Sequence, residues 1–222
     1  MVRERAKIAR KVVSRSLIAY LNPTHRISEQ YRTIRNSIQY ASDGKSVRSL
    51  IVTSPGEGDG KSTAAINLAI SIAQRGERVL LIDANFRNPM LHKIFNTQIS
   101  PGLSNVLTDQ LTFEESTQET EVEGLWLMTS GLSFGNSADM LDSNKMKELL
   151  RGATDRFDRI VIDSPPVLTA PDTNALVNKC DGVVLLLRCG KTTHSKALEA
   201  KQSLSFAGAN IIGAILNQKN VR

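Results

Sequence analysis

Short apolar runs alternate with segments of helical periodicity along most of the chain. The apolar runs are typical of buried strands and occupy residues 48–53, 78–82, 124–129, 159–163, 183–187 and 211–216. Between them, apolar residues spaced three or four apart predict helices at 61–74, 143–157, 171–179 and 195–206. Strands that alternate with helices predict an α/β fold: a doubly wound, mostly parallel sheet with right-handed crossovers, flanked by helices.

A further amphipathic helix is predicted ahead of the first strand, with Ser28 as its N-cap. Its apolar stripe is spaced three, four and three residues apart, at Tyr31, Ile34, Ile38 and Ala41. Its other side carries three charged residues that can pair along the helix, Glu29, Arg32 and Arg35. This side predicts either a solvated surface or a contact with another chain.

Residues 90–123 are less regular than the rest. Gly102-Leu103 and the acidic run from Glu114 to Glu123 predict short helices at the surface. The chain has no internal repeat and no low-complexity tract.

Length and composition fit one α/β domain, since 222 residues with 41% hydrophobic content can bury a full core. No apolar run approaches the ~20 residues of a membrane span, and the basic N-terminus lacks a secretory signal. Cys180 and Cys189, near the two ends of a predicted strand, are expected to be small buried hydrophobes in a reducing cytosol. We therefore expect a cytoplasmic protein.

The net charge of +6 is uneven, because residues 1–15 hold six Lys or Arg residues and one Glu. We assign 1–26 to a basic N-terminal arm and 27–222 to the catalytic domain. The arm fits an amphipathic helix on an anionic membrane surface, or equally a partly disordered segment or a helix packed on a partner. Nucleic acid is not expected as a partner, since no basic patch interleaved with aromatic residues occurs.

The stretch after the first predicted strand has the P-loop pattern Gly-x-x-x-x-Gly-Lys-Ser, with Pro55 in place of its first glycine. Glycines let backbone N–H groups turn toward phosphate oxygens, and the start of the next helix adds unpaired N–H groups. Lys61 can reach the β- and γ-phosphates, and the Ser62 hydroxyl can ligate Mg²⁺. The predicted nucleotide site consists of Gly56, Gly58, Asp59, Gly60, Lys61, Ser62 and Thr63.

Two of the predicted strands lead into an aspartate. Asp163 follows an apolar strand in the Walker B arrangement, and Asp83 follows the strand after the P-loop helix. The carboxyl ends of parallel strands meet at one edge of a sheet, so both should lie beside the P-loop. A carboxylate held there can bind Mg²⁺ directly or through water. We predict a metal site of Ser62, Asp83 and Asp163, with a simple turn role as the alternative for Asp83.

Four segments together resemble the bacterial tyrosine kinases of capsule and exopolysaccharide synthesis. They are the P-loop at 54–63, the Walker A′ segment at 80–89, the Walker B segment at 160–166 and the Glu-x-x-Arg-x-x-Arg motif at 29–35. The resemblance spans about residues 27–219. It implies an ATP-dependent protein-tyrosine kinase of the autokinase type that regulates capsular or exopolysaccharide biosynthesis.

The resemblance also implies roles for single residues. ATP and Mg²⁺ are the expected cofactors, with Lys61, Asp83 and Asp163 as catalytic residues and Asn217 near the adenine. Glu29, Arg32 and Arg35 are expected to join the subunits of a ring-forming homo-oligomer. The expected partners are protein tyrosine substrates and a transmembrane activator of polysaccharide export, which would recruit the kinase to the inner face of the membrane.

The chain departs from the family pattern at three places. Asn85 stands where the A′ motif usually has a second aspartate, and an amide cannot act as a base. Residues 134–137 replace a proline-rich stretch. The C-terminal tyrosine cluster is absent: the tyrosines are Tyr20, Tyr31 and Tyr40, so either a tail was removed or the kinase acts on other substrates.

Two other classes stay open. A partitioning or septum-site type ATPase is disfavoured, because such proteins carry an extra lysine early in the P-loop, where this chain has Gly56. A weakly active, nucleotide-binding regulatory subunit is compatible with Asn85.

Overall fold

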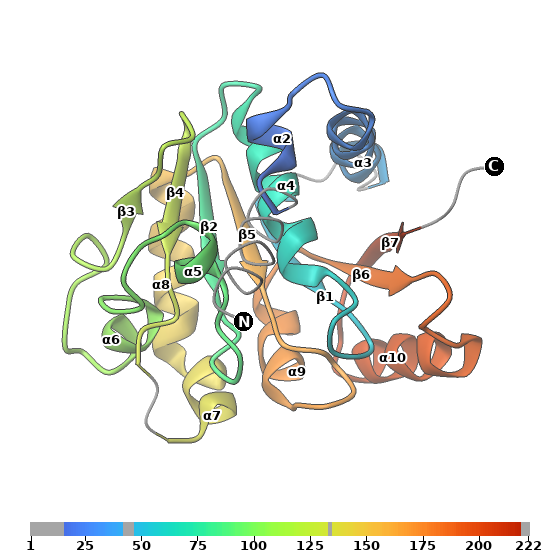
Figure 1. Cartoon of the computed structure of the whole chain (residues 1–222). Coiled ribbons are helices and arrows are strands. Elements are labelled where there is room, and N and C mark those ends of the chain that lie inside the picture. The colour runs from blue at the N-terminus through green and yellow to red at the C-terminus, as the bar shows by residue number, and fades with distance from the viewer. Residues whose placement is uncertain (1–15, 42–46, 133–134, 219–222) are drawn as a thin grey trace, which may run out of the picture.

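The computed structural model describes residues 16–41, 47–132 and 135–218. They form a central sheet of seven strands in the order β3-β4-β2-β5-β1-β6-β7 (Figure 1). The strands are β1 (Ser49–Thr53), β2 (Val79–Asp83), β3 (Gln118–Glu119), β4 (Leu125–Met128), β5 (Arg159–Asp163), β6 (Gly182–Arg188) and β7 (Ile211–Asn217). Every pair is parallel except β3–β4. The predicted doubly wound α/β fold is confirmed.

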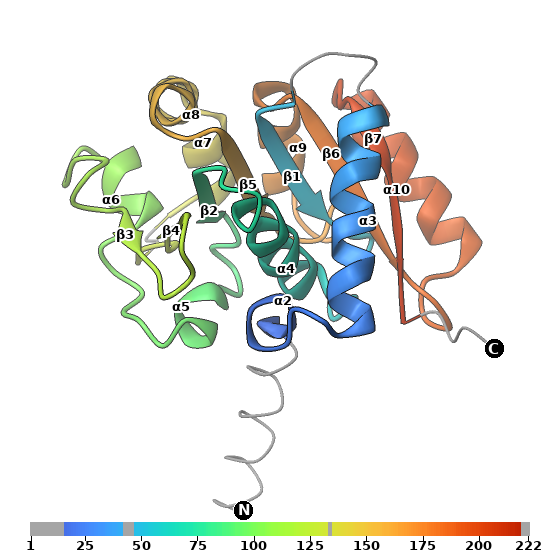
Figure 2. The ribbon, with the colours of Figure 1, turned by 90° about the horizontal axis from the view of Figure 1, so that it is seen from above.

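Helices cover both faces of the sheet, as the view from above shows (Figure 2). One face packs on α2 (Ile18–Leu21), α3 (Arg26–Ala41), α4 (Lys61–Ala73) and α5 (Leu91–Ile94). The other packs on α6 (Leu103–Leu107), α7 (Ser137–Asp142), α8 (Asn144–Arg156), α9 (Asp172–Leu176) with the 3₁₀ turn η1 (Val177–Lys179), and α10 (His194–Phe206).

The inner strands are buried on both faces, which explains their continuous apolar runs. Successive side chains of a strand point to opposite faces. On β5, Val161 joins the core under α4, whereas Ile160 and Ile162 join the core under α8. Strands that are apolar on both faces must be covered by helices on both sides. The continuous apolar runs are therefore consistent with a sheet between two layers of helices.

The long predicted helices and strands match the structure to within two residues at most ends, but three details were wrong. α3 begins at Arg26, so Ser28 is not its N-cap: the Ser28 side chain is buried inside the helix and donates to the carbonyl of Asn22 at 2.7 Å. The acidic run contains the short strand β3 rather than a helix, because Gln118 and Glu119 pair with β4. Cys189 is exposed rather than buried.

The residues just before α3 pack on α4 through one buried amide. Asn67 is fully buried in α4 and accepts a hydrogen bond from the Ala19 N–H at 2.9 Å. Its Nδ2 donates to the carbonyls of Ser16 and Thr63, each at 2.8 Å. Residues 16–25, which we had assigned to the arm, therefore contact the P-loop helix, while 1–15 lie outside the described residues.

α3 is fastened to the same helix. Three residues of the predicted apolar stripe, Tyr31, Ile34 and Ile38, pack against the core, whereas the fourth, Ala41, is exposed at the end of the helix. The Arg35 guanidinium donates to the backbone carbonyl of Ser71 in α4 at 2.5 Å.

Among the described residues, none of the helices combines the length and the apolar character that a membrane span requires.

Replacing Asn67 by alanine tests the link between α2 and α4. The change leaves the buried Ala19 N–H without its acceptor and removes the donor to the Ser16 carbonyl, while the Thr63 carbonyl keeps its helical hydrogen bond. We therefore expect the free energy of unfolding to fall by about 2–3 kcal/mol. Denaturant titration followed by circular dichroism measures it. Gln202→Ala, which removes an exposed amide on α10, is the matched control and should change stability by less than about 0.5 kcal/mol. Equal midpoints for the two variants would contradict the assignment.

Candidate active site at the carboxyl edge of the sheet

The P-loop joins β1 to α4 in a backbone conformation that requires glycine. Gly60, the residue before α4, has a φ of +100°. A Cβ there would also come within 2.4 Å of the Asn217 amide nitrogen. No side chain caps the start of α4. Its first N–H groups and the positive end of its dipole are therefore available to an anion.

The two strand-end aspartates lie side by side. β2 and β5 are neighbours, and their register pairs Asp83 with Asp163. Both carboxylates are fully buried. Asp83 accepts hydrogen bonds from the backbone N–H groups of Asn85, Met90 and Leu91 at 3.0–3.1 Å, which fixes its orientation. Neither oxygen of Asp163 has a hydrogen-bond partner among the described residues.

Burial and mutual repulsion set the electrostatics of this pair. Burial raises the pKa of Asp83 above its usual value, and its three backbone donors and Lys61 oppose the rise. Burial and the charge of Asp83 raise the pKa of Asp163, while Lys61 and the Ser62 hydroxyl lower it. Lys61, which is only 8% exposed, therefore acts on both carboxylates. The single positive charge of Lys61 thus acts on two carboxyl groups, Asp83 and Asp163.

A buried carboxylate with no hydrogen-bond partner in the described part of the chain suits the binding of a cation. An isolated charge is costly to bury, whereas Mg²⁺ at nucleotide sites is held by one or two carboxylates together with substrate phosphates. No group of three or more His, Cys, Asp or Glu side chains in the described residues forms an all-protein metal site. Asp163 and the neighbouring Ser62 thus suit a metal ion that arrives with a nucleotide.

The ends of β6 and β7 hold the loop from the side. The Asn217 side chain donates to the Asp59 carbonyl at 2.7 Å, so this predicted residue does contact the P-loop. Arg188 donates to the Gly58 carbonyl at 2.8 Å, and Lys191 forms an ion pair with Asp59 at 3.3 Å. We had not predicted Arg188 or Lys191. Their sequence signal is weak: Arg188 is the last residue of a buried strand, and Lys191 follows three residues later.

The A′ loop after β2 is a hydrogen-bonded turn. The Asn85 side chain accepts from the Asn88 N–H at 3.2 Å, a role that an aspartate can fill equally well. Arg87 donates to the buried carboxylate of Asp172 at 3.0 Å, and the Ser137 hydroxyl donates to the same carboxylate. Sequence reasoning missed this link, which ties the A′ loop to α7 and α9.

Some predicted residues have other contacts. The Thr63 hydroxyl lies 3.2 Å from that of Ser16, on the side of α2. The Gly56 N–H donates to the Asp59 carboxylate at 3.2 Å. Glu29 and Arg32 form an ion pair on the exposed side of α3.

The loop, the paired aspartates and the parallel sheet define a P-loop nucleotide-binding domain. Residues 49–205 match the family model described as an AAA domain. The chain is 40% identical to the tyrosine-protein kinase YwqD of Bacillus subtilis (strain 168), over 94% of this chain and 88% of that protein. It is 33% identical to the tyrosine-protein kinase CpsD of Streptococcus agalactiae serotype III (strain NEM316), over 90% and 86%.

Solved structures agree. The kinase domain of the Escherichia coli tyrosine kinase ETK superposes with a TM-score of 0.89 at 30% identity, covering 93% of this chain and 81% of that one. The chimerical protein CapA2B2 gives a TM-score of 0.88 at 33% identity, covering 92% and 90%. The chain belongs to the bacterial tyrosine-protein kinases. The predicted family, fold class and enzyme class are confirmed.

Two glycine variants test the geometry of the P-loop. Gly60→Ala puts a Cβ against Asn217 at a φ that alanine rarely adopts. We expect the free energy of unfolding to fall by about 1–3 kcal/mol and nucleotide binding to weaken by roughly tenfold or more. Gly152→Ala is the matched control: it lies in α8 with open space around its Cβ position and should gain about 0.5–1 kcal/mol. Denaturation and calorimetric titration with ADP measure both. If both variants behaved alike, the loop would not need glycine at position 60.

Proposed function

We propose that the chain transfers the γ-phosphoryl group of ATP to tyrosine hydroxyls of proteins, with Lys61, Asp83 and Asp163 as its catalytic residues. The observation that supports this most is the pair of buried aspartates in register beside the P-loop lysine. One of them, Asp163, has no hydrogen-bond partner within residues 16–41, 47–132 and 135–218. In the reaction, the tyrosine oxygen attacks the γ-phosphorus, the bond to the bridging oxygen breaks, and ADP leaves.

Each residue has a distinct role in this proposal. Lys61 supplies a fixed positive charge where negative charge develops on the phosphoryl oxygens. Ser62 and Asp163 would hold Mg²⁺, which when bound neutralises phosphate charge. Asp83, oriented by three N–H groups, would accept the tyrosine proton or support the metal; its raised pKa makes it a better base than an ordinary aspartate. Asn217 would lie beside the adenine, and its hydrogen bond to the Asp59 carbonyl places it next to the P-loop, where a nucleotide would bind.

The physiological setting follows from the family. We propose that the kinase regulates capsular or exopolysaccharide biosynthesis, and that a transmembrane activator of polysaccharide export recruits it to the inner face of the cell membrane. The sequence holds three tyrosines, Tyr20, Tyr31 and Tyr40, and no tyrosine cluster, so the assay below supplies tyrosines on a separate protein.

A related fold does not by itself suggest another activity. The septum site-determining protein MinD of Pyrococcus horikoshii superposes with a TM-score of 0.67 but at 22% identity, which supports a common fold alone. Gly56 occupies the position where that class carries its extra lysine. A weakly active regulatory subunit is a second candidate, because the amide of Asn85 cannot act as a base. The rate measurement below distinguishes it from an active kinase.

We also propose that α3 joins subunits in a ring, through Glu29 and Arg32. Their side chains are 58% and 34% exposed, so both can meet another chain. Arg35 is different: it binds the Ser71 carbonyl within its own chain, so much of its role is internal. Exposed ion pairs contribute little to the stability of a monomer, and a subunit contact would give this pair a purpose.

Lys61→Ala tests the catalytic proposal. Loss of one preorganised charge should lower the rate of phosphoryl transfer by roughly 10²–10³-fold, with the fold intact. Transfer from γ-labelled ATP to a tyrosine-containing protein, followed by phosphoamino-acid analysis, measures it. Lys201→Ala, an exposed lysine of α10, is the control and should keep the wild-type rate. Full activity in Lys61→Ala would refute the site, and a wild-type chain that binds ATP without transfer would favour the regulatory subunit.

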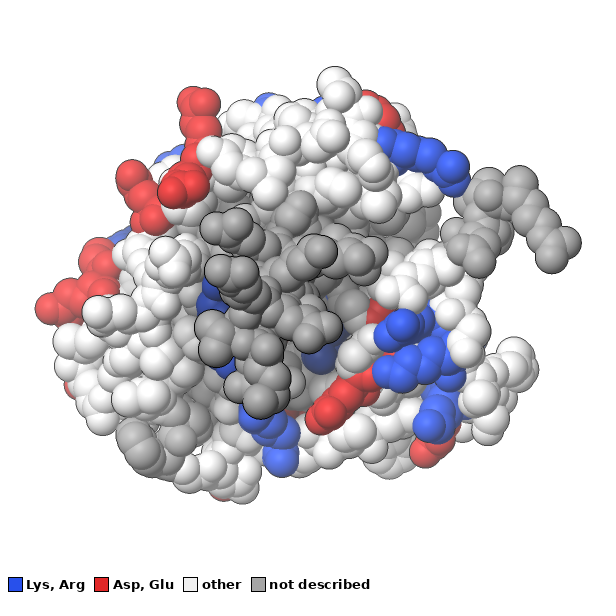
Figure 3. Space-filling model, in the orientation of Figure 1, with Lys and Arg blue, Asp and Glu red and all other residues white. Residues whose placement is uncertain are grey.

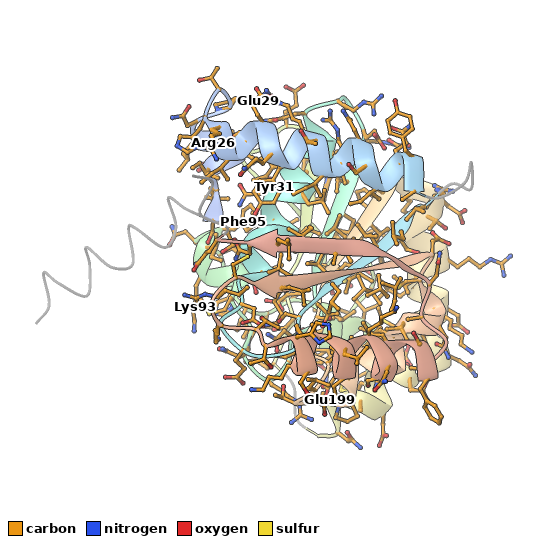
Figure 4. All side chains as sticks on the ribbon, turned by 90° about the vertical axis from the view of Figure 1, so that its right-hand side faces the viewer. Arg26, Glu29, Tyr31, Lys93, Phe95 and Glu199 are labelled. Atoms are coloured by element: carbon orange, nitrogen blue, oxygen red, sulfur yellow. The ribbon has the colours of Figure 1, made fainter. Side chains whose placement is uncertain are left out.

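The Glu29→Ala/Arg32→Ala double variant tests the ring. It removes charges that the proposed interface needs while leaving the bond from Arg35 to α4 in place, so a smaller particle with unchanged stability is expected. Light scattering gives the mass and thermal melting gives the stability. Glu199→Ala is the control, because Glu199 lies on α10, across the molecule from α3 (Figure 4). An unchanged mass would leave the Glu29–Arg32 pair as a solvated surface.

A further inference from the structure

The P-loop contains a buried carboxylate that the proposed reaction does not use. Asp59 is 2% exposed, and its Oδ2 accepts the Gly56 N–H at 3.2 Å, which keeps the side chain within the loop. A P-loop binds polyphosphate through N–H groups and a lysine. A carboxylate inside such a loop repels the same ligand, because like charges a few ångströms apart oppose each other strongly in a site shielded from water.

Lys191 lies against this carboxylate. Its Nζ is 3.3 Å from Asp59 Oδ1 and also donates to the Glu57 carbonyl. The side chain of Lys191 is 46% exposed, whereas that of Asp59 is 3% exposed, so the pair joins a half-solvated cation to a buried anion. Lys and Arg atoms gather beside acidic atoms on this face of the molecule (Figure 3).

The turn that carries Lys191 is held in place by its own backbone. The Arg188 carbonyl accepts hydrogen bonds from the N–H groups of Lys191 and Thr192, at 3.1 and 2.8 Å. The Thr192 hydroxyl in turn accepts from the Arg188 N–H at 3.0 Å. Gly190 has a φ of +76°, which this turn requires. The lysine is therefore presented to the loop by a rigid support.

Three successive loop carbonyls bind donors on this side. They belong to Glu57, Gly58 and Asp59, and their donors are Lys191, Arg188 and Asn217. Carbonyl oxygens that are engaged in this way do not face a bound polyphosphate, which they would repel. The turn after β6 thus acts on both the shape and the charge of the loop.

We propose that Lys191 is the counter-ion of Asp59 and a positioning residue of the nucleotide site: it neutralises the carboxylate inside the P-loop and thereby sets the affinity for polyphosphate. This inference rests on the proposed use of ATP. Without Lys191, the loop keeps its shape through Arg188 and Asn217 but presents an uncompensated negative charge to the ligand.

A double-mutant cycle in the full chain tests the proposal, with calorimetric titration of Mg²⁺–ADP as the readout. Lys191→Met should weaken ADP binding by on the order of tenfold. Asp59→Asn, whose amide oxygen can still accept the Gly56 N–H, should bind ADP at least as tightly as the wild type. In the Asp59→Asn background, Lys191→Met should then cost less than about threefold, because no buried charge is left to neutralise.

Two further variants complete the test. Lys191→Arg keeps the charge and should retain most of the affinity. Lys196→Met removes an exposed lysine of α10 that forms no ion pair within the described residues, and should leave binding unchanged.

The outcomes are distinct. If Lys191→Met bound ADP as tightly as the wild type, this inference alone would be overturned. A loss in Lys191→Met that persists in the Asp59→Asn background would also overturn it, since Lys191 would then act on the phosphates or the backbone directly. A wild type that binds no ADP would overturn the proposed function, and this inference with it.

Discussion

The pairing of β2 with β5 is the constraint on which the site depends, because it sets two buried carboxylates side by side. Register alone brings Asp83 and Asp163 together at the carboxyl edge of the sheet. Only Asp83 is satisfied by backbone donors, and Lys61 is shared between the two. Such a pair is poorly balanced without a further positive charge. The register therefore concentrates negative charge at one point of the sheet edge, and this is the basis of the proposed metal site.

The rest of the molecule holds the P-loop around this pair from several directions. α4 supplies the uncapped N–H groups, and Asn67 fixes α4 against the segment before α3. The ends of β6 and β7 hold the loop's carbonyls through Arg188 and Asn217. Elements that are distant in sequence thus contact the same short loop, residues 54–60, between β1 and α4. This explains why the site depends on β6 and the outer strand β7 as well as on β1, β2 and β5.

Periodicity and motif spacing were sufficient to predict six of the seven strands that the structure describes, the long helices and the residues at the strand ends. Parallel strands place their carboxyl ends at one edge, so Asp83 and Asp163 follow from topology. Arg188, Lys191 and the Arg87–Asp172 pair could not be predicted, because their roles depend on loop conformations that no local pattern encodes. Ser28 was misassigned because α3 begins two residues earlier, where the His25 ring nitrogen accepts a hydrogen bond from the Ile27 N–H at 3.1 Å.

Asn85 shows how the charge balance limits what the A′ loop can carry. Its amide forms the turn to Asn88 without adding charge beside Asp83. A third carboxylate at this point would share the single nearby lysine with two others whose pKa values are already raised by burial. In the absence of a bound cation, the amide is therefore the less costly residue. An aspartate at position 85 would attract a metal ion more strongly than the neutral amide does. The amide therefore favours the stability of the protein without metal, and an aspartate would favour metal binding.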